Sequence, residues 1–108
     1  NDKKLSCLFF IAKLNEIFDD YSGWHWVNSN PVIFLDPPAV DQVHKIKIPT
    51  LIVLGEEDLA DLHGIADFLE ANIESSQKVI LKNAGHMSNM EQPEEFNSLV
   101  IDFLNGIN

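Results

Sequence analysis

Arginine is absent from this chain of 108 residues, whose basic residues are seven lysines against seventeen aspartates and glutamates. The formal charge of −10 leaves no basic stripe that could neutralise the phosphates of a nucleic acid. An anionic membrane surface would repel the chain as well. We therefore expect neither nucleic acid nor membrane as a partner.

Cysteine is nearly absent too. The single Cys7 cannot form a disulfide within the chain, and this favours a reducing, cytoplasmic compartment. Hydrophobic residues make up 45% of the chain, so a disordered protein is excluded and a buried core is expected.

Long hydrophobic runs are missing. Lys3 and Lys4 before an apolar stretch over residues 5–12 resemble the start of a signal peptide, but Lys13 ends the stretch and no small-residue cleavage site follows. Eight residues are also too few to span a bilayer. We predict instead a buried helix over residues 5–20 that is apolar on nearly all sides. Such a helix needs cover on all sides, so we expect further protein before Asn1.

The next segment, residues 21–43, is predicted to be irregular because Gly23, Pro31 and the pair Pro37-Pro38 interrupt it. Asp36 precedes the proline pair, as is common at turns. We therefore expect it to connect the first helix to a more regular second half.

The second half of the chain is regular. Residues 50–54 form a continuous apolar run, which is typical of a parallel strand buried on both faces. A helix is predicted over residues 62–73, with Asp61 as its cap, followed by a strand over residues 78–81. Pro93 then opens a final helix. The sequence therefore predicts a βαβα unit with two parallel strands.

A carboxylate and a histidine follow the ends of these two strands. Asp58 lies in the turn after the first strand, and His86 lies in the turn after the second. Since the carboxyl ends of parallel strands meet at one edge of the sheet, we expect the two side chains to lie within hydrogen-bonding distance. A carboxylate on the Nδ1–H of a histidine fixes its tautomer and stabilises the imidazolium. The pair looks like two members of a Ser-Asp-His system.

Three segments carry a family pattern in order: Ile48-Pro-Thr-Leu-Ile-Val-Leu-Gly-Glu-Glu-Asp58, Lys78-Val-Ile-Leu-Lys-Asn-Ala-Gly-His-Met87 and Met90-Glu-Gln-Pro-Glu-Glu-Phe96. Together they resemble the C-terminal portion of the α/β-hydrolase superfamily. The resemblance implies a three-layer α/β fold in which Asp58 is the triad acid and His86 the triad base. It also implies that residues 1–46 are a lid remnant with a return linker, and that residues 47–108 are the C-terminal βαβα unit of the core.

The serine nucleophile of that family is missing. No Gly-x-Ser-x-Gly turn occurs in the sequence, and the family's oxyanion-hole loop would also lie upstream. The resemblance therefore implies the acid-and-base part of a serine hydrolase for a small ester or similar acyl compound, which needs no cofactor. The chain alone is expected to be inactive. Two alternatives stay open: a noncatalytic α/β interaction module, and the same part of a dehalogenase or epoxide hydrolase with an aspartate nucleophile.

Other titratable residues near the pair have simpler explanations. Competing acids share the loop with Asp58: Glu56, Glu57 and Asp61. The spacing from Gly55 favours Asp58. His63 is explained by a surface pair with Asp67, one turn further along the helix. A metal site would have to combine carboxylate and imidazole ligands from Asp58, Asp61, His63 and His86. These residues lack the ligand spacing of known sites, so no metal is predicted.

Four residues are weaker candidates for contact with a substrate. Leu59 and Met87 each adjoin a predicted triad position, although packing on the pocket floor would explain them as well. Trp24 and Trp26 could line an acyl pocket beneath the lid, although aromatic residues in a loop usually anchor it to the core.

Two parallel strands that are apolar on both faces leave an open sheet edge. We therefore expect this chain to pair with a missing N-terminal half or to self-associate, for example by exchanging its N-terminal helix with a neighbour.

Overall fold

The computed structural model describes residues 2–29, 31 and 33–107. The chain divides into two compact units, Asn1–Asp36 and Pro37–Asn108. None of the helices in the described part of the chain combines the length and the apolar character that a membrane span needs.

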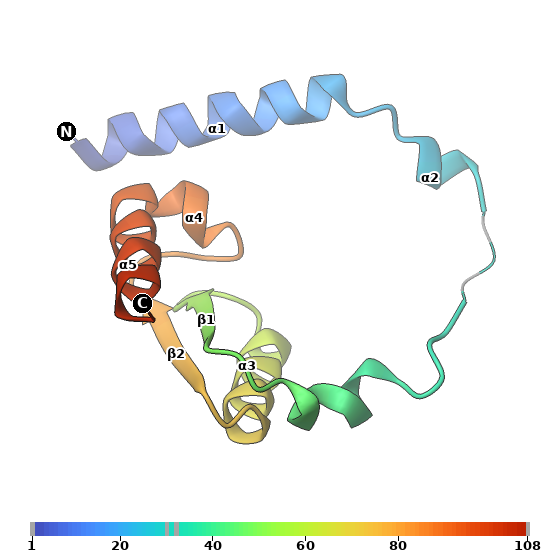
Figure 1. The fold of residues 1–108 in the computed structure, drawn as a ribbon. Coiled ribbons are helices and arrows are strands. Elements are labelled where there is room, and N and C mark those ends of the chain that lie inside the picture. Colours follow the sequence, from blue (N-terminus) through green and yellow to red (C-terminus); the bar gives the residue numbers. More distant parts are fainter. Residues whose placement is uncertain (1, 30, 32, 108) are drawn as a thin grey trace. The chain divides into compact units, whose positions relative to one another are not determined.

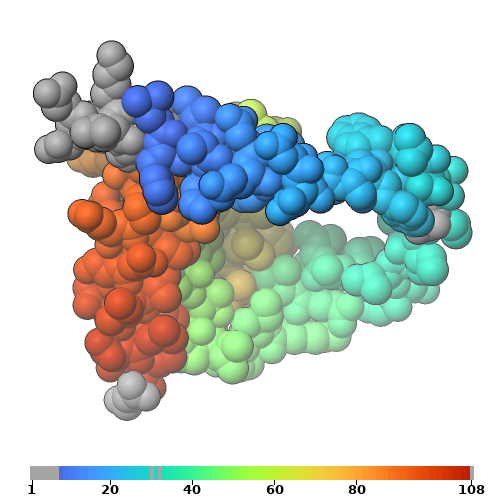
Figure 2. Space-filling view, turned by 90° about the horizontal axis from the view of Figure 1, so that it is seen from above, coloured from blue at the N-terminus to red at the C-terminus, as the bar shows by residue number. Residues whose placement is uncertain are grey.

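The first unit is helical. Helix α1 (Asp2–Asp20) confirms the predicted first helix, and the space-filling view shows it continuing toward α2 (Trp24–Val27) as one elongated body (Figure 2). Several apolar side chains of α1 are exposed: Leu8, Phe9, Ile11, Ile17 and Phe18. The burial that we predicted for this helix is therefore not found among the described residues.

The segment predicted to be irregular contains two short helices. Gly23 precedes α2 with a φ of 64°, a left-handed conformation that glycine adopts at little cost. Pro38 precedes the 3₁₀ helix η1 (Ala39–Lys45), at a position where a missing N–H is tolerated. Two of the residues that indicated an irregular chain, Gly23 and Pro38, thus stand at helix starts, which the prediction did not anticipate.

The second unit holds the predicted βαβα order. Its strands are β1 (Thr50–Gly55) and β2 (Ser76–Leu81), and α3 (Ala60–Asn72) connects them. The short α4 (Ser88–Glu91) and then α5 (Pro93–Gly106) follow β2. Four residues are too few to show a helical period, so α4 was not predicted, whereas α5 begins at Pro93 as expected.

The two strands pair in parallel, as predicted. Thr50 lies opposite Ser76 and Gly55 lies opposite Leu81. The two strands therefore end at the same level, and the turns that follow them start from one edge of the sheet.

Helices cover both sides of this sheet. Figure 1 shows α3 and α5 on opposite sides of the strands, which gives the three-layer order helix, sheet, helix. The apolar core of the described residues includes five side chains: Leu54, Ala66, Ile73, Leu81 and Ala84. The apolar residues Ile65 on α3 and Leu104 on α5 are 53% and 51% exposed. A sheet of two strands, about 5 Å apart, is narrower than a helix about 10 Å across. It therefore covers only part of the apolar face of each helix.

Helix α3 starts earlier than predicted. Its N-cap is Leu59, without a side-chain cap, so the prediction that Asp61 caps this helix is wrong. Asp61 lies in the first turn instead, where the helix dipole still favours a carboxylate. The earlier start brings the Leu59 N–H to the Asp58 carboxylate, with the nitrogen 2.8 Å from Oδ1.

Candidate active site

The site is built from two turns that leave the same edge of the sheet. The acid turn, residues 55–59, follows β1, and the histidine turn, residues 84–87, follows β2. Two backbone hydrogen bonds tie the acid turn to the chain around the histidine turn: the Glu56 N–H donates to the carbonyl of Leu81 at the end of β2 over 2.8 Å, and the Glu57 N–H donates to the carbonyl of Ala84 in the histidine turn over 2.9 Å. The position of one turn therefore fixes the position of the other.

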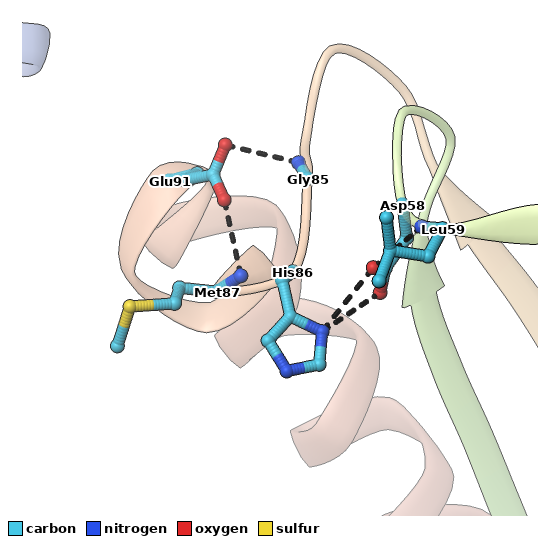
Figure 3. Close-up of polar contacts among 6 residues, drawn as sticks. All are labelled: Asp58, Leu59, Gly85, His86, Met87 and Glu91. Atoms are coloured by element: carbon cyan, nitrogen blue, oxygen red, sulfur yellow. Dashed lines mark hydrogen bonds and ion pairs between the residues drawn. The ribbon is translucent and has the colours of Figure 1, made fainter. Parts of the chain in front are cut away.

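Asp58 and His86 meet across these turns, as the topology predicted. The Nδ1 atom of His86 lies 3.2 Å from Oδ1 and 3.3 Å from Oδ2 of Asp58. Figure 3 shows the ring with this nitrogen toward the carboxylate and with its other nitrogen directed away. In the tautomer that carries its proton on Nδ1, the ring donates to Asp58 and keeps a lone pair on Nε2. That arrangement leaves Nε2 able to accept a proton.

Burial differs sharply between the two partners. The Asp58 side chain is only 6% exposed, whereas that of His86 is 74% exposed. Desolvation raises the pKa of Asp58, but the Leu59 N–H and the His86 ring more than offset it, so that the pKa lies below its usual range. Asp58 is therefore a carboxylate at neutral pH, and it is paired with an imidazole that is exposed to solvent.

A third side chain, Glu91, holds the histidine turn. Its Oε2 accepts the Gly85 N–H over 2.9 Å, and its Oε1 accepts the Met87 N–H over 3.1 Å. These donors flank His86 on both sides (Figure 3). Sequence reasoning missed this residue. The sequence holds no standard signal for it, because Glu91 lies four residues after Met87, the N-cap of α4, whereas the glutamate of a capping box lies three residues after its N-cap.

A shallow apolar groove adjoins the pair. It has a volume of about 230 Å³ and is lined by β1, α3 and the two turns. Its polar lining comes from Asp58, His86 and Ser88, and the remaining lining is apolar. His86 therefore stands at the boundary between an apolar hollow and open surface.

The weaker candidates lie in different places. The Leu59 side chain is 70% exposed in the acid turn, and Met87, half-buried, occupies the histidine turn. Trp24 and Trp26 belong to the first unit, where they are 53% and 80% exposed. A role of any of these four in substrate contact stays a prediction.

The predicted partner of His63, Asp67, has a stronger partner in Lys78. Asp67 forms its hydrogen bond with Lys78, with Oδ1 2.6 Å from Nζ, and the charge of His63 makes a smaller contribution to the lowered pKa of Asp67. Lys78 reaches Asp67 because β2 runs alongside α3, a contact that spacing along the helix could not reveal. Within residues 2–29, 31 and 33–107, no three His, Cys, Asp or Glu side chains are grouped so as to hold a metal ion.

Comparison with known proteins begins with sequence. No family model matches the chain. Monoacylglycerol lipase ABHD6 of Mus musculus is 42% identical over 65 residues, which are 59% of this chain and 19% of that protein. Carboxylesterase YbfK of Bacillus subtilis is 36% identical over 81 residues, which are 73% of this chain and 26% of that protein. The chain thus spans about a fifth to a quarter of the length of these curated relatives.

Solved structures agree with the sequence matches. The crystal structure of carboxylesterase CesB (YbfK) from Bacillus subtilis superimposes with a TM-score of 0.56 at 31% identity over 73% of this chain and 27% of that one. MGS-MChE2, an α/β hydrolase from a lagoon sediment metagenome, gives a TM-score of 0.59 at 26% identity over 64% of this chain and 32% of that one. With its parallel strands, its three layers and its hydrolase relatives, this chain belongs to the α/β-hydrolase superfamily.

Proposed function

We propose that Asp58 and His86 are the acid and the general base of a serine-hydrolase triad. The nucleophile of this triad lies on a part of the full protein outside these 108 residues. The observation that carries the proposal is the 3.2 Å contact between His86 Nδ1 and Asp58 Oδ1 at the carboxyl ends of two parallel strands. This contact supplies the oriented, charge-stabilised imidazole that the mechanism requires.

In the first half of the reaction the serine Oγ attacks the carbonyl carbon of an ester. His86 Nε2 takes the hydroxyl proton as the new C–O bond forms, and the resulting imidazolium is stabilised by the Asp58 carboxylate. The imidazolium then returns the proton to the leaving alkoxide as the C–O bond of the ester breaks. An alcohol departs and an acyl-enzyme remains.

In the second half a water molecule attacks the acyl-enzyme. His86 Nε2 removes one water proton while the new C–O bond forms, and it gives the proton back to the serine Oγ as the acyl group leaves as an acid. The names of ABHD6 and YbfK, a monoacylglycerol lipase and a carboxylesterase, support a carboxylic ester as the substrate class. Leu59, Met87, Trp24 and Trp26 are proposed to contact its acyl or alcohol part.

The test uses the intact protein that contains these residues and a nitrophenyl ester as substrate. His86→Gln removes the general base, so we expect kcat to fall about 10³-fold or more. Asp58→Asn leaves the shape but favours the wrong imidazole tautomer, so we expect a loss of about 10⁴-fold. Matched controls are His63→Gln and Asp61→Asn, in the same region, which should retain full activity.

Covalent labelling tests the identity of the nucleophile. A fluorophosphonate probe should modify one serine of the intact protein and none in the 108-residue chain. Full esterase activity in His86→Gln would exclude the proposal. Labelling of no residue in an active enzyme would point to an aspartate nucleophile, as in a dehalogenase or epoxide hydrolase.

A further inference from the structure

From its two backbone contacts we infer that Glu91 is a positioning residue for His86. The inference rests on the proposed function, because it assigns to Glu91 the task of aiming the general base. Glu91 itself touches neither Asp58 nor the imidazole in any bond that the structure records, and it acts through the backbone of the histidine turn.

The first step is the geometry of the turn. Gly85 and Met87 donate their N–H groups to separate oxygens of one carboxylate, so the Ala84–Gly85 peptide, one residue before the histidine, and the His86–Met87 peptide directly after it are both held by a single planar group. Hydrogen bonds to an ionised acceptor are stronger and shorter than neutral ones. These bonds limit rotation of the backbone around His86. The imidazole ring therefore stays directed toward Asp58.

The second step is how Glu91 is itself held in place. Its own N–H donates to the Met87 carbonyl over 2.9 Å, which closes the single turn of α4 back onto the histidine turn. A Cβ on Gly85 would come within 3.3 Å of Glu91 Oε1. The glycine before His86 thus leaves room for the carboxylate to approach the backbone closely.

The third step is the exposure of the ring. Because 74% of the His86 side chain is exposed, packing restrains the imidazole only weakly. Its direction then depends on two restraints: Asp58 at Nδ1, and the backbone that Glu91 fixes. Loss of the second restraint should disturb the pair without removing either partner.

The experiment measures ester hydrolysis by the intact protein with Glu91→Gln, which keeps the side-chain size but presents an amide NH₂ to one of the two N–H donors. We expect kcat to fall about 10- to 100-fold, since small errors in the placement of a catalytic group have effects of this size. KM should change little. Glu91→Asp, which keeps the charge but shortens the reach, should recover part of the loss, and the exposed Glu95→Gln is the matched control with unchanged kcat.

A double-mutant cycle separates positioning from general stability. In the Asp58→Asn background the aim of the ring no longer matters, so Glu91→Gln should lower kcat by less than about 2-fold. Equal losses in both backgrounds would overturn the inference, as would an unchanged kcat in Glu91→Gln when His86→Gln is inactive. An active His86→Gln enzyme would instead end the proposed function, and this inference with it. Should Glu91→Gln fail to fold, the same cycle is run with Glu91→Asp.

Discussion

Gly55 at the end of β1 lies so close to Gly85 that a Cβ atom on Gly55 would overlap the Gly85 carbonyl oxygen. The same Cβ would also overlap the carbonyl of Ala84. The acid turn and the histidine turn are therefore in direct backbone contact, and this contact exists only because residue 55 has no side chain.

Gly55→Ala should consequently destabilise the protein. Backbone atoms on both sides must move to admit the methyl group, and overpacking of this kind costs about 1–3 kcal/mol. The measurement is the free energy of unfolding in urea. The matched control is Gly64→Ala on α3, where nothing lies within 4 Å of an added Cβ; it should stabilise by about 0.5–1 kcal/mol. Equal stability of Gly55→Ala and the wild type would contradict the close contact.

Leu81 lies opposite Gly55 at the end of β2 and is buried at the same edge of the sheet. Its side chain is 1% exposed, so Leu81→Ala leaves a cavity and should cost about 2–5 kcal/mol. Ile80→Ala is the control in the neighbouring position, since Ile80 is 45% exposed and should lose much less. The measurement is the urea midpoint of each variant. A smaller loss of stability for Leu81→Ala than for Ile80→Ala would contradict the burial of Leu81 in the core.

Much of this arrangement follows from the sequence because it depends on period and topology. The apolar runs of the two strands and the connecting helix sufficed to predict parallel pairing, and parallel pairing sufficed to bring Asp58 to His86. The contacts of Gly55 could not be predicted in this way. These contacts join backbone atoms about 30 residues apart in the sequence. No local sequence pattern therefore shows which glycine is required by close packing.

The errors have equally specific causes. Asp61 was assigned as the cap of α3 because aspartate favours that position, but the helix begins at Ala60 and leaves Asp61 inside. Spacing along α3 pairs Asp67 with His63, whereas the neighbouring strand supplies a stronger partner, Lys78, at 2.6 Å. Glu91 was missed because α4 is a single turn. Propensity and spacing describe one element at a time, and these contacts arise between elements.

Lys78 provides a prediction on pH. Its Nζ lies 2.6 Å from carboxylate oxygens of both Asp67 and Glu70. The hydrogen bond from Lys78 lowers the pKa of Asp67. The hydrogen bond to Asp67 and, to a smaller extent, the one to Glu70 raise the pKa of Lys78. The lowered carboxyl pKa gives stability that is complete above the ordinary value of 3.8 and is lost as the pH falls through the folded value. The raised pKa gives stability that is complete below 10.5 and is lost as the pH rises through the folded value.

Urea midpoints measured from pH 2 to pH 12 should therefore fall at both extremes, and Lys78→Met should flatten both limbs of the curve. The matched control is Lys47→Met. Lys47 forms a 3.3 Å pair with Glu74 in which the two side chains are 67% and 78% exposed, and exposed pairs contribute little. Identical curves for Lys78→Met and the wild type would show that the Lys78 cluster adds nothing to stability.

The apolar groove beside His86 leads to a prediction about association. Ile65 lines it on α3 and is 53% exposed, and the sheet formed by the described residues has two strands, so apolar surface and a strand edge are both open in the second unit. Surfaces of this kind promote association. We expect the 108-residue chain to self-associate, so that its weight-average mass in sedimentation equilibrium rises with concentration. Ile65→Lys should reduce this rise, whereas Ala71→Lys, exposed on the same helix outside the groove, should leave it unchanged. A constant monomer mass at millimolar concentration would refute the prediction.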